Sequence, residues 1–537
     1  MSEKTDEIEP VTLSLTYFVL LFFVMAWVSL FPSVLFGYWF FITFPFSFNP
    51  IYLLSLIPLF FALYGIALLS SLIFTKLGIW IIHKRITYPE VGTYRVSMDE
   101  PQTRAFMIKI NIRSFGRWLY YFFHLKFLRA FWMRQQGVKI GKNVKLAKYI
   151  EDEEFQEFGD NTYMAKSVGF SGHMMDNEYL VVTETIVGKN CIFEHLSGGV
   201  GATIGDNSVF RELTGAMKGY VCRGNAIYQG IPCKKIGEYS DLSPAEIEEV
   251  KQKIREKDKT NYIKRKNAPI KISGAKLFTM KLLIVIGGCL FALLFLYLYS
   301  ILFQAFYSPT NHLLNIAFLT LVPFIFIITL GFFSVGTTLF TKIFLAYYDH
   351  KAEIPEGYYE LDDPRAKIFK IKYLLRLFGL RLFRAMPFKV GDTFVMRFWG
   401  NVTFGNYIVI ENAIVDPQYL ELGDNVVMAA GARIHTHDII KGKLYIKKVK
   451  IGKNSILGGC CHIKPGVELP ARSIVAAAAW FRKNRKCKRP ALWMGKPAFE
   501  LPLIALTGST GIKKKVVDDK YDKAQAQREI KKKKIKI

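Results

Sequence analysis

Apolar residues recur at multiples of six positions along two long stretches of this chain. In the second stretch they are Phe404, Ile410, Leu422, Met428 and Ile434, and after a break Ile451, Leu457, Ile463, Leu469 and Val475. In the first stretch they are Ile140, Leu146, Phe158, Met164 and Phe170, and after a break Val187 and Phe193. A period of six fits neither an α-helix nor a single long strand. It predicts a three-sided parallel β-helix, in which each group of six residues forms one short strand and one corner.

The two stretches are copies of each other. Four residues have counterparts 264 positions later: Gly141 and Gly405, Gly159 and Gly423, His173 and His437, and Gly188 and Gly452. Equal spacing without a gap indicates an internal duplication of one fold. After Gly188 the first copy departs from the pattern, because Gly205 follows 17 residues on, one fewer than three groups of six require. We therefore expect the last coils of the first copy to be irregular.

Four apolar stretches are long enough to cross a bilayer, which takes about 20 residues. They are Leu13–Trp39, Tyr52–Ile82, Leu277–Phe306 and Leu314–Tyr347. The connectors Phe46–Ile51 and Tyr307–His312 contain no Lys or Arg, whereas the regions after Lys76 and Lys342 are rich in both. The positive-inside rule then predicts a multi-pass protein of the cell membrane, with both termini and both β-helix domains in the cytoplasm. Seven cysteines without a Cys-x-x-Cys pair fit a reducing compartment.

The expected fold is a membrane protein with two α-helical transmembrane hairpins and two tandem parallel β-helix domains of the hexapeptide-repeat kind, related by internal duplication. The first half divides into a cytoplasmic N-terminus at 1–10, a transmembrane hairpin at 11–85, a membrane-surface amphipathic region at 86–136 and a β-helix domain at 137–238. A helical linker at 239–275 follows, and then a transmembrane hairpin at 276–348, an amphipathic region at 349–388, a β-helix domain at 389–502 and a basic disordered tail at 503–537.

The chain is strongly basic, with a formal net charge of +28 and a mean hydropathy of +0.20. On so apolar a protein this charge indicates contact with anionic lipid or phosphate-bearing ligands. Aromatic residues are not interleaved with the charges of the tail, so no nucleic-acid partner is expected. The stretches Thr103–Arg134 and Lys367–Phe388 mix aromatic, leucine and basic residues. They predict helices that lie either on the inner membrane surface or against the soluble domains.

Both halves end in a similar phrase. The first reads Tyr228-Gln229-Gly230-Ile231-Pro232-Cys233-Lys234-Lys235, and the second reads Trp493-Met494-Gly495-Lys496-Pro497-Ala498. After the groups of six, this phrase resembles the Gly-x-Pro-Ala-Lys terminator of hexapeptide-repeat acyltransferases. The resemblance implies left-handed β-helices that commonly form homo-oligomers. It also implies that Lys234, Lys235 and Lys496 lie near the phosphates of coenzyme A or of a phosphopantetheine arm; solvated surface lysines are the alternative.

A closer resemblance covers much of each half. The run Asp416-Pro417-Gln418-Tyr419-Leu420-Glu421-Leu422-Gly423-Asp424, followed by Ile434-His435-Thr436-His437, is similar to the membrane-embedded C-terminal region of non-ribosomal peptide synthetases of the ε-poly-lysine-synthetase type. That region also alternates transmembrane hairpins with hexapeptide domains and carries a Thr-His-x-Phe-Glu-Asp motif. Here the second half keeps Thr436 and His437 without the acidic pair, and the first half keeps His173 without the threonine. Adenylation and carrier domains are absent from the sequence, so a peptide-bond role would need them from another protein.

The resemblance implies that His173 and His437 act as general bases. A neutral imidazole accepts a proton from an amine or hydroxyl, which then attacks a thioester carbonyl. Each histidine precedes a break in the groups of six, which predicts a loop beside an active site. Asp176 or Glu178 would orient His173, and Asp438 would orient His437. The alternative is a histidine bonded to a carbonyl group of the coil.

Two further sets of polar residues have other interpretations. Asp152 and Asp416 are duplicated at positions where an apolar residue is expected, and since a buried carboxylate is costly unless bonded, we interpret them as marks of a bent corner. The histidines 435, 437 and 462 invite comparison with the three-histidine zinc site of γ-class carbonic anhydrases. Their spacing differs from that family's, and His435 and His462 have no counterparts in the first half, so no metal is expected.

These features predict a membrane-bound acyltransferase. It would move an acyl or aminoacyl group from a coenzyme A or carrier-protein thioester to an amine or hydroxyl at the inner membrane face, without a permanently bound cofactor. Its partners would be membrane lipid and the thioester donor. A non-catalytic membrane scaffold that binds partners on its β-helix surfaces is the alternative. The sequence leaves open the donor, the acceptor, the pathway and whether both halves are active.

Overall fold

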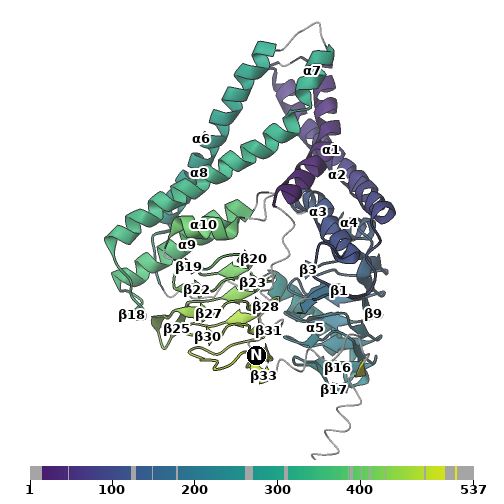
Figure 1. The fold of residues 1–537 in the computed structure, drawn as a ribbon, viewed down its shortest axis with the longest axis vertical. Helices are drawn as coiled ribbons and strands as arrows, with labels where there is room; N and C mark the ends of the chain where they lie inside the picture. The colour runs from purple at the N-terminus through teal and green to yellow at the C-terminus, as the bar shows by residue number, and fades with distance from the viewer. Residues whose placement is uncertain are drawn as a thin grey trace, which may run out of the picture.

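The chain forms four long apolar helices above two stacks of short strands (Figure 1). The computed structural model describes residues 15–501 and 515–516, with gaps at 46, 123–127, 148, 177–178, 260–269, 307–311, 385, 387–390, 401, 411–412, 430 and 477–478. The predicted N-terminus 1–10, Glu178 and most of the predicted tail 503–537 lie outside the described residues.

Four helices are long and apolar enough to cross a membrane, as the hydropathy pattern predicts. They are α1 (Leu15–Thr43), α2 (Pro50–Arg85), α6 (Gly274–Phe306) and α8 (Val322–Lys351), with the short α7 (His312–Leu319) before α8. α1 packs on α2, and α6 packs on α8. The two pairs are joined by a hydrogen bond of 2.8 Å from Nε1 of Trp27 to the carbonyl of Thr320. Both strand stacks lie at the same end of these helices (Figure 1), and the side of the membrane that they face stays a prediction.

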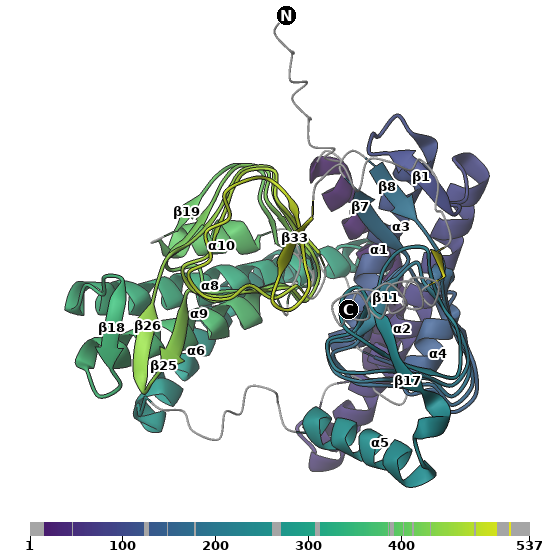
Figure 2. The ribbon, with the colours of Figure 1, turned by 90° about the horizontal axis from the view of Figure 1, so that it is seen from below.

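The strands of the second half visit three sheets in a fixed rotation. The first sheet holds β19 (Thr403–Phe404), β22 (Leu420–Leu422), β27 (Val449–Ile451) and β30 (Glu468–Leu469). The second holds β20 (Val409–Ile410), β23 (Val427–Met428), β28 (Ile456–Leu457), β31 (Ile474–Val475), β32 (Leu492–Met494) and an antiparallel β33 (Phe499–Leu501). The third holds β21 (Ile414–Val415), β24 (Arg433–Ile434) and β29 (His462–Ile463). The chain thus winds along a three-sided path, seen from below in Figure 2; its left hand stays a prediction.

The first half repeats this arrangement. Its first sheet holds β2 (Lys139–Ile140), β4 (Gln156–Phe158), β9 (Thr185–Val187), β12 (Thr203–Ile204), β15 (Tyr220–Cys222) and β34 (Lys515–Val516). The second holds β5 (Tyr163–Met164), β10 (Ile192–Phe193), β13 (Ser208–Phe210), β16 (Ala226–Gln229) and an antiparallel β17 (Lys234–Glu238). The third holds β3 (Tyr149–Ile150), β6 (Gly169–Ser171), β11 (Gly198–Val200) and β14 (Gly215–Ala216). The expectation of irregular last coils is wrong: Ile192 pairs with Val209 and Ile204 with Cys222, so the missing residue only shortens one coil.

The residues at multiples of six positions fill the interior of both stacks. In the second half Met428, Ile434, Leu457 and Ile463 are fully buried. In the first half the interior is a column of aromatic rings, in which successive centroids from Phe158 through Phe170, Phe193 and Phe210 to Tyr228 lie 5.4, 5.1, 5.0 and 5.2 Å apart. The periodicity therefore identifies the side chains that hold the coils together.

The two breaks in the groups of six form β-hairpins. In the first half β7 (His173–Asp176) pairs with β8 (Tyr179–Val182), and in the second half β25 (His437–Ile440) pairs with β26 (Lys443–Ile446). A third, antiparallel strand completes each hairpin: β1 (Gly92–Arg95) and β18 (Gly357–Glu360) respectively. These third strands come from the segment that follows each membrane pair.

A pair of helices in each half separates the membrane helices from the coils (Figure 1). They are α3 (Pro101–Phe122) and α4 (Arg129–Gln135) in the first half, and α9 (Pro364–Arg384) and α10 (Asp392–Trp399) in the second. Lys109 on α3 and Lys372 on α9 are only 1% and 2% exposed, so these polar faces are turned inward. Lys109 pairs with Glu154 of the coils and Lys372 with Asp349 on α8, so both interpretations of these stretches stay open. In the linker, α5 (Pro244–Lys259) begins at a capping box, where the Ser243 amide donates to Glu246 Oε2 at 2.8 Å.

Candidate functional site

Each hairpin brings one duplicated histidine onto a buried aspartate. His173 begins β7, and its Nδ1 lies 2.6 Å from Oδ2 of Asp152. His437 begins β25, and its Nδ1 lies 2.6 Å from Oδ2 of Asp416. The aspartate side chains are 4% and 3% exposed, whereas the histidine side chains are 26% and 20% exposed. The same pair therefore recurs in both halves, with a ring that solvent can reach.

The aspartates are held by further donors that keep them ionised. Asp152 accepts hydrogen bonds from the amide of Gly172 at 3.0 Å and the hydroxyl of Ser171 at 3.1 Å, and Asp416 accepts one from Thr436 Oγ1 at 2.7 Å. Burial alone would raise the pKa of each carboxyl, but the histidine together with the other surrounding hydrogen-bond donors and positive charges lowers it below its usual range. Because an ionised carboxylate only accepts, the neutral form of each histidine donates from Nδ1, which makes Nε2 its basic nitrogen.

One of the predicted acidic partners of the histidines binds a different residue. Asp438, which we expected beside His437, lies 3.1 Å from Nζ of Lys464 through its Oδ2. Asp176 lies at the end of β7, and Glu178 lies outside the described residues. The corner interpretation of Asp152 and Asp416 missed their role: Asp152 does have a left-handed backbone with φ of 58°, but both carboxylates point inward and bind the histidines.

One helix in each half places the same three residue types against the Asp–His pair. They are Phe106, Lys109 and Arg113 on α3, and Phe369, Lys372 and Arg376 on α9. Spacing of three and seven residues puts the three on one face of a helix. The ring of Phe106 meets the ring of His173 edge-on at 5.1 Å, and the ring of Phe369 meets that of His437 at 4.9 Å. The helices therefore hold both imidazole rings from the membrane side.

In the second half a row of aromatic and basic side chains leads from His437 to the terminator. The ring of His435 lies 6.5 Å from that of His437 and 6.1 Å from that of His462. Trp480 stacks on His462 at 5.1 Å, and Nζ of Lys496 lies 4.3 Å from the centre of the Trp480 ring. Lys496, a predicted phosphate ligand, therefore lies at the end of a row of side chains that begins at the predicted base His437.

The first half differs at the same strand positions. His462 pairs with Trp480 across the third sheet, and the corresponding pair in the first half is Gly198 with Gly215. Lys234 is exposed, and Lys235 forms an ion pair of 2.5 Å with Glu238. Among the residues that the structure describes, no group of three or more His, Cys, Asp or Glu is arranged to hold a metal ion.

Sequence reasoning missed two sets of site residues. Asp152 and Asp416 carried a signal, because they are duplicated at the same spacing as the histidines. The helix residues carried a second one: the pattern Phe-x-x-Lys-x-x-x-Arg at Phe106–Arg113 recurs at Phe369–Arg376. Only the folded chain shows that, in each half, the aspartate and the helix residues meet at the ring of the same histidine.

Comparisons with known proteins match parts of the chain. No protein-family model matches it. A delta-poly-L-ornithine synthetase of Acinetobacter baumannii (strain AB307-0294) is 30% identical over 88 residues, which are 16% of this chain and only 7% of that protein. A maltose O-acetyltransferase from Clostridium difficile 630 is 18% identical over 21% of this chain and 76% of its own, with a TM-score of 0.19. AntD, an N-acyltransferase from Bacillus cereus solved with dTDP and 3-hydroxybutyryl-CoA, is 14% identical over 24% of this chain and 97% of its own, with a TM-score of 0.15.

Proposed function

We propose that the chain is a membrane-bound acyltransferase that moves an acyl or aminoacyl group from a coenzyme A or carrier-protein thioester to an amine or hydroxyl. The observation that carries this proposal is the Asp–His pair, with Nδ1 and Oδ2 2.6 Å apart in both halves. A carboxylate on Nδ1 fixes the ring and its tautomer and stabilises the imidazolium that forms, as a general base requires. The similarity of a segment to a delta-poly-L-ornithine synthetase supports an aminoacyl group as one of the groups transferred.

In the proposed reaction, Nε2 of the histidine takes the proton of the acceptor as its nitrogen or oxygen attacks the thioester carbonyl. The new C–N or C–O bond forms, the C–S bond breaks, and the departing thiolate takes the proton back from the imidazolium. In the second half, Lys496 would meet the phosphates of the donor at the far end of the row that starts at His437. This row makes His437 the better supported of the two bases.

Thiol release from an acyl-coenzyme A in the presence of a small amine tests the proposal on the purified full chain. The double variant His173→Ala with His437→Ala should lose the release while keeping the cooperative thermal unfolding of the wild type. His350→Ala, which removes an exposed histidine from α8, is the matched control and should keep full activity. A double variant as fast as the wild type would overturn the proposal. A wild type that consumes no thioester but retains protein partners would favour the scaffold alternative.

A further inference from the structure

The two halves differ in how they neutralise one buried arginine. On α3, Nη1 of Arg113 lies 3.2 Å from Oε2 of Glu153 and also pairs with Glu154, and Nη2 donates to the carbonyl of Gln136 at 3.1 Å. Arg117, one turn further on, pairs with the other oxygen of Glu153 at 2.7 Å. Glu153 is only 3% exposed, so the first half supplies a buried carboxylate of its own to this helix.

The second half has the arginine but lacks the carboxylate. Since Asp152 corresponds to Asp416, the next residues Glu153 and Glu154 correspond to Pro417 and Gln418. Arg376 is 3% exposed, and its Nη1 donates to Oε1 of Gln418 at 2.6 Å. Its Nε and Nη2 are buried with no hydrogen-bond partner. These two nitrogens form one edge of the guanidinium, which is the edge that binds both oxygens of a carboxylate.

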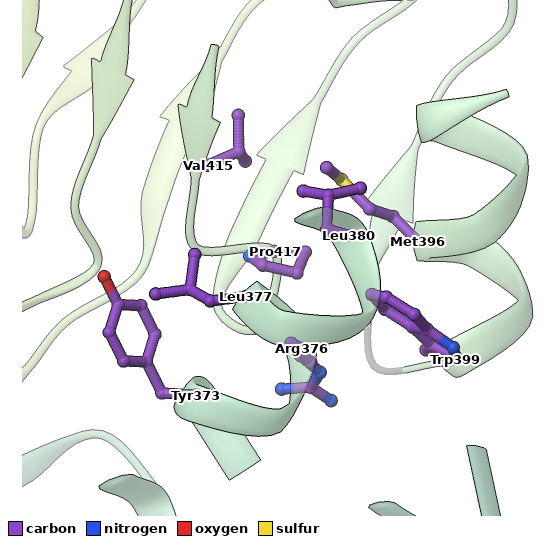
Figure 3. Close-up of a pocket in the computed structure, with 8 residues that line it drawn as sticks. All are labelled: Tyr373, Arg376, Leu377, Leu380, Met396, Trp399, Val415 and Pro417. Carbon is purple, nitrogen blue, oxygen red and sulfur yellow. The ribbon is translucent and has the colours of Figure 1, made fainter. Parts of the chain in front are cut away.

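A small cavity lies where the first half has its ion pair. Arg117 is replaced by Leu380 on α9 and Glu153 by Pro417, and both line this cavity together with Arg376, Met396 and Trp399 (Figure 3). The space open to the centre of a water-sized sphere is about 10 Å³, which is about what one water molecule needs, so a ligand would place a single oxygen atom there. A buried N–H without a partner costs about 1–3 kcal/mol, more on a charged group, so an occupant that accepts from this edge would be favoured.

The acids nearest to Arg376 do not fill this role. Asp416 binds the ring of His437 and the hydroxyl of Thr436. Asp349 on α8 is paired with Lys372. In the part of the chain that the structure describes, the apolar walls offer this edge of Arg376 no acceptor. A ligand could supply one.

We infer that the second half holds a carboxylate-binding subsite at Arg376, in the place where the first half inserts its own Glu153. The head of the ligand enters the cavity, and its body lies outside. The subsite borders the Asp–His pair, because Tyr373 lines the cavity and its ring lies 4.8 Å from that of His437. If the proposed function holds, on which this last step rests, the carboxylate belongs to the acceptor, which is then an amino or hydroxy acid.

Acetate is the probe that tests the subsite in the purified full chain. Thermal unfolding of the wild type at constant ionic strength should shift upward and saturate with acetate. Acetamide, the neutral molecule of the same shape, and chloride should give no such shift. No acetate effect, as expected for a buried water at Arg376, would overturn the inference. An equal effect of acetamide, or an effect of inorganic phosphate without one of acetate, would overturn it too.

Pro417→Glu gives the second half the carboxylate of the first. It should raise the unfolding temperature without ligand and weaken acetate binding at least tenfold. Lys450→Gln makes the same change in net charge at an exposed position of β27 and should bind acetate like the wild type. A Pro417→Glu chain that binds acetate as the wild type does would contradict the inference; if it fails to fold, the comparison of acetate with acetamide on the wild type still decides.

The acetate-binding measurements use no thioester, so their result does not depend on whether the proposed transfer occurs. Where transfer is observed, glycine should be a better acceptor than glycinamide in the wild type. Pro417→Glu should remove that preference. Equal use of the two acceptors by the wild type would leave acetate binding standing and reject the assignment of the subsite to the acceptor.

Discussion

His435 and His462 stay neutral in the folded second half. Burial, reinforced by neighbouring positive charges, lowers the pKa of His435 from 6.5 to about 4 and that of His462 to about 3. As the pH falls from 6.5, the unfolded chain binds protons that the folded chain does not, so the free energy of unfolding must decrease until about pH 4. The decrease is at most about 1.4 kcal/mol per pH unit for each histidine.

Thermal unfolding recorded between pH 4 and pH 7 measures this dependence. The double variant His435→Gln with His462→Gln lacks both titrations, so its unfolding temperature should change less over that range than that of the wild type. His350→Gln is the control and should follow the wild type. The same slope in the double variant and the wild type would show that these rings do not titrate as described.

Lys496 should act on donor binding more than on the chemical step. A hydrogen bond to a charged group contributes about 1.5–3 kcal/mol, so Lys496→Ala should raise the KM for the coenzyme A thioester roughly ten- to a hundredfold. The value of kcat should change little, since Lys496 lies at the far end of the row from His437. Lys234→Ala, at the terminator of the first half, is the control. Steady-state rates test this prediction. Equal effects of Lys496→Ala and Lys234→Ala on the KM would show that the two halves do not differ in donor binding.

The sequence predicts the site residues that lie in a local pattern and misses those whose partners are distant in sequence. His173 and His437 are predictable because they are duplicated beside breaks in a regular pattern. Asp152 and Asp416 lie 21 residues before them, about one coil away, and only the stacking of coils brings each carboxylate to its ring. Asp438, next to His437 in sequence, looked like a better partner, but a strand points neighbouring side chains to opposite faces.

At the scale of elements, the aromatic column is the part of the fold that the periodicity predicts most directly. Phe193 is fully buried between Phe170 and Phe210. Phe193→Ala should therefore cost about 3–5 kcal/mol of unfolding free energy. Ile236→Ala, at a position that is 50% exposed on β17, should cost less than about 0.5 kcal/mol. Chemical unfolding followed by circular dichroism compares them, and similar losses would show that the column is not the core.

The hairpins and α3 and α9 were less predictable. β1 and β18 complete sheets with strands about 85 residues away, which no local pattern reveals. The amphipathic pattern of α3 and α9 fits a membrane surface and a protein surface equally, because both bury one apolar face. The buried lysines show only that one face of each helix packs on protein, because Lys109 pairs with Glu154 in the coils and Lys372 with Asp349 on membrane helix α8.

At the scale of the whole molecule, the two halves pack in one chain. A Cβ on Gly495, in the second terminator, would lie 3.4 Å from the carbonyl oxygen of Ile231 in the first. The membrane pairs also meet, through Trp27 and Thr320. The duplication thus gives two similar units side by side (Figure 2), and the assembly of further copies stays a prediction.

The sidedness of the membrane helices is a prediction of the charge pattern. In a chain without its exposed and half-buried cysteines (Cys289, Cys460 and Cys487), Asn49→Cys should react with an impermeant maleimide added to intact cells. Ser243→Cys, before α5, should react only after the membrane is opened. The reverse pattern would place both coils outside and exclude a cytoplasmic thioester donor.

The rate of thiol release by a chain with Asp152→Asn and Asp416→Asn tests the central claim most directly. Asparagine keeps the shape of the side chain but not the charge that fixes the Nδ1–H tautomer. If the pairs provide the base, the rate should fall by a factor on the order of 10²–10⁴ with the unfolding transition preserved, while Asp438→Asn, whose carboxylate pairs with Lys464, should stay near the wild-type rate. A wild-type rate in the Asp152→Asn, Asp416→Asn chain would contradict the claim that these pairs provide the base.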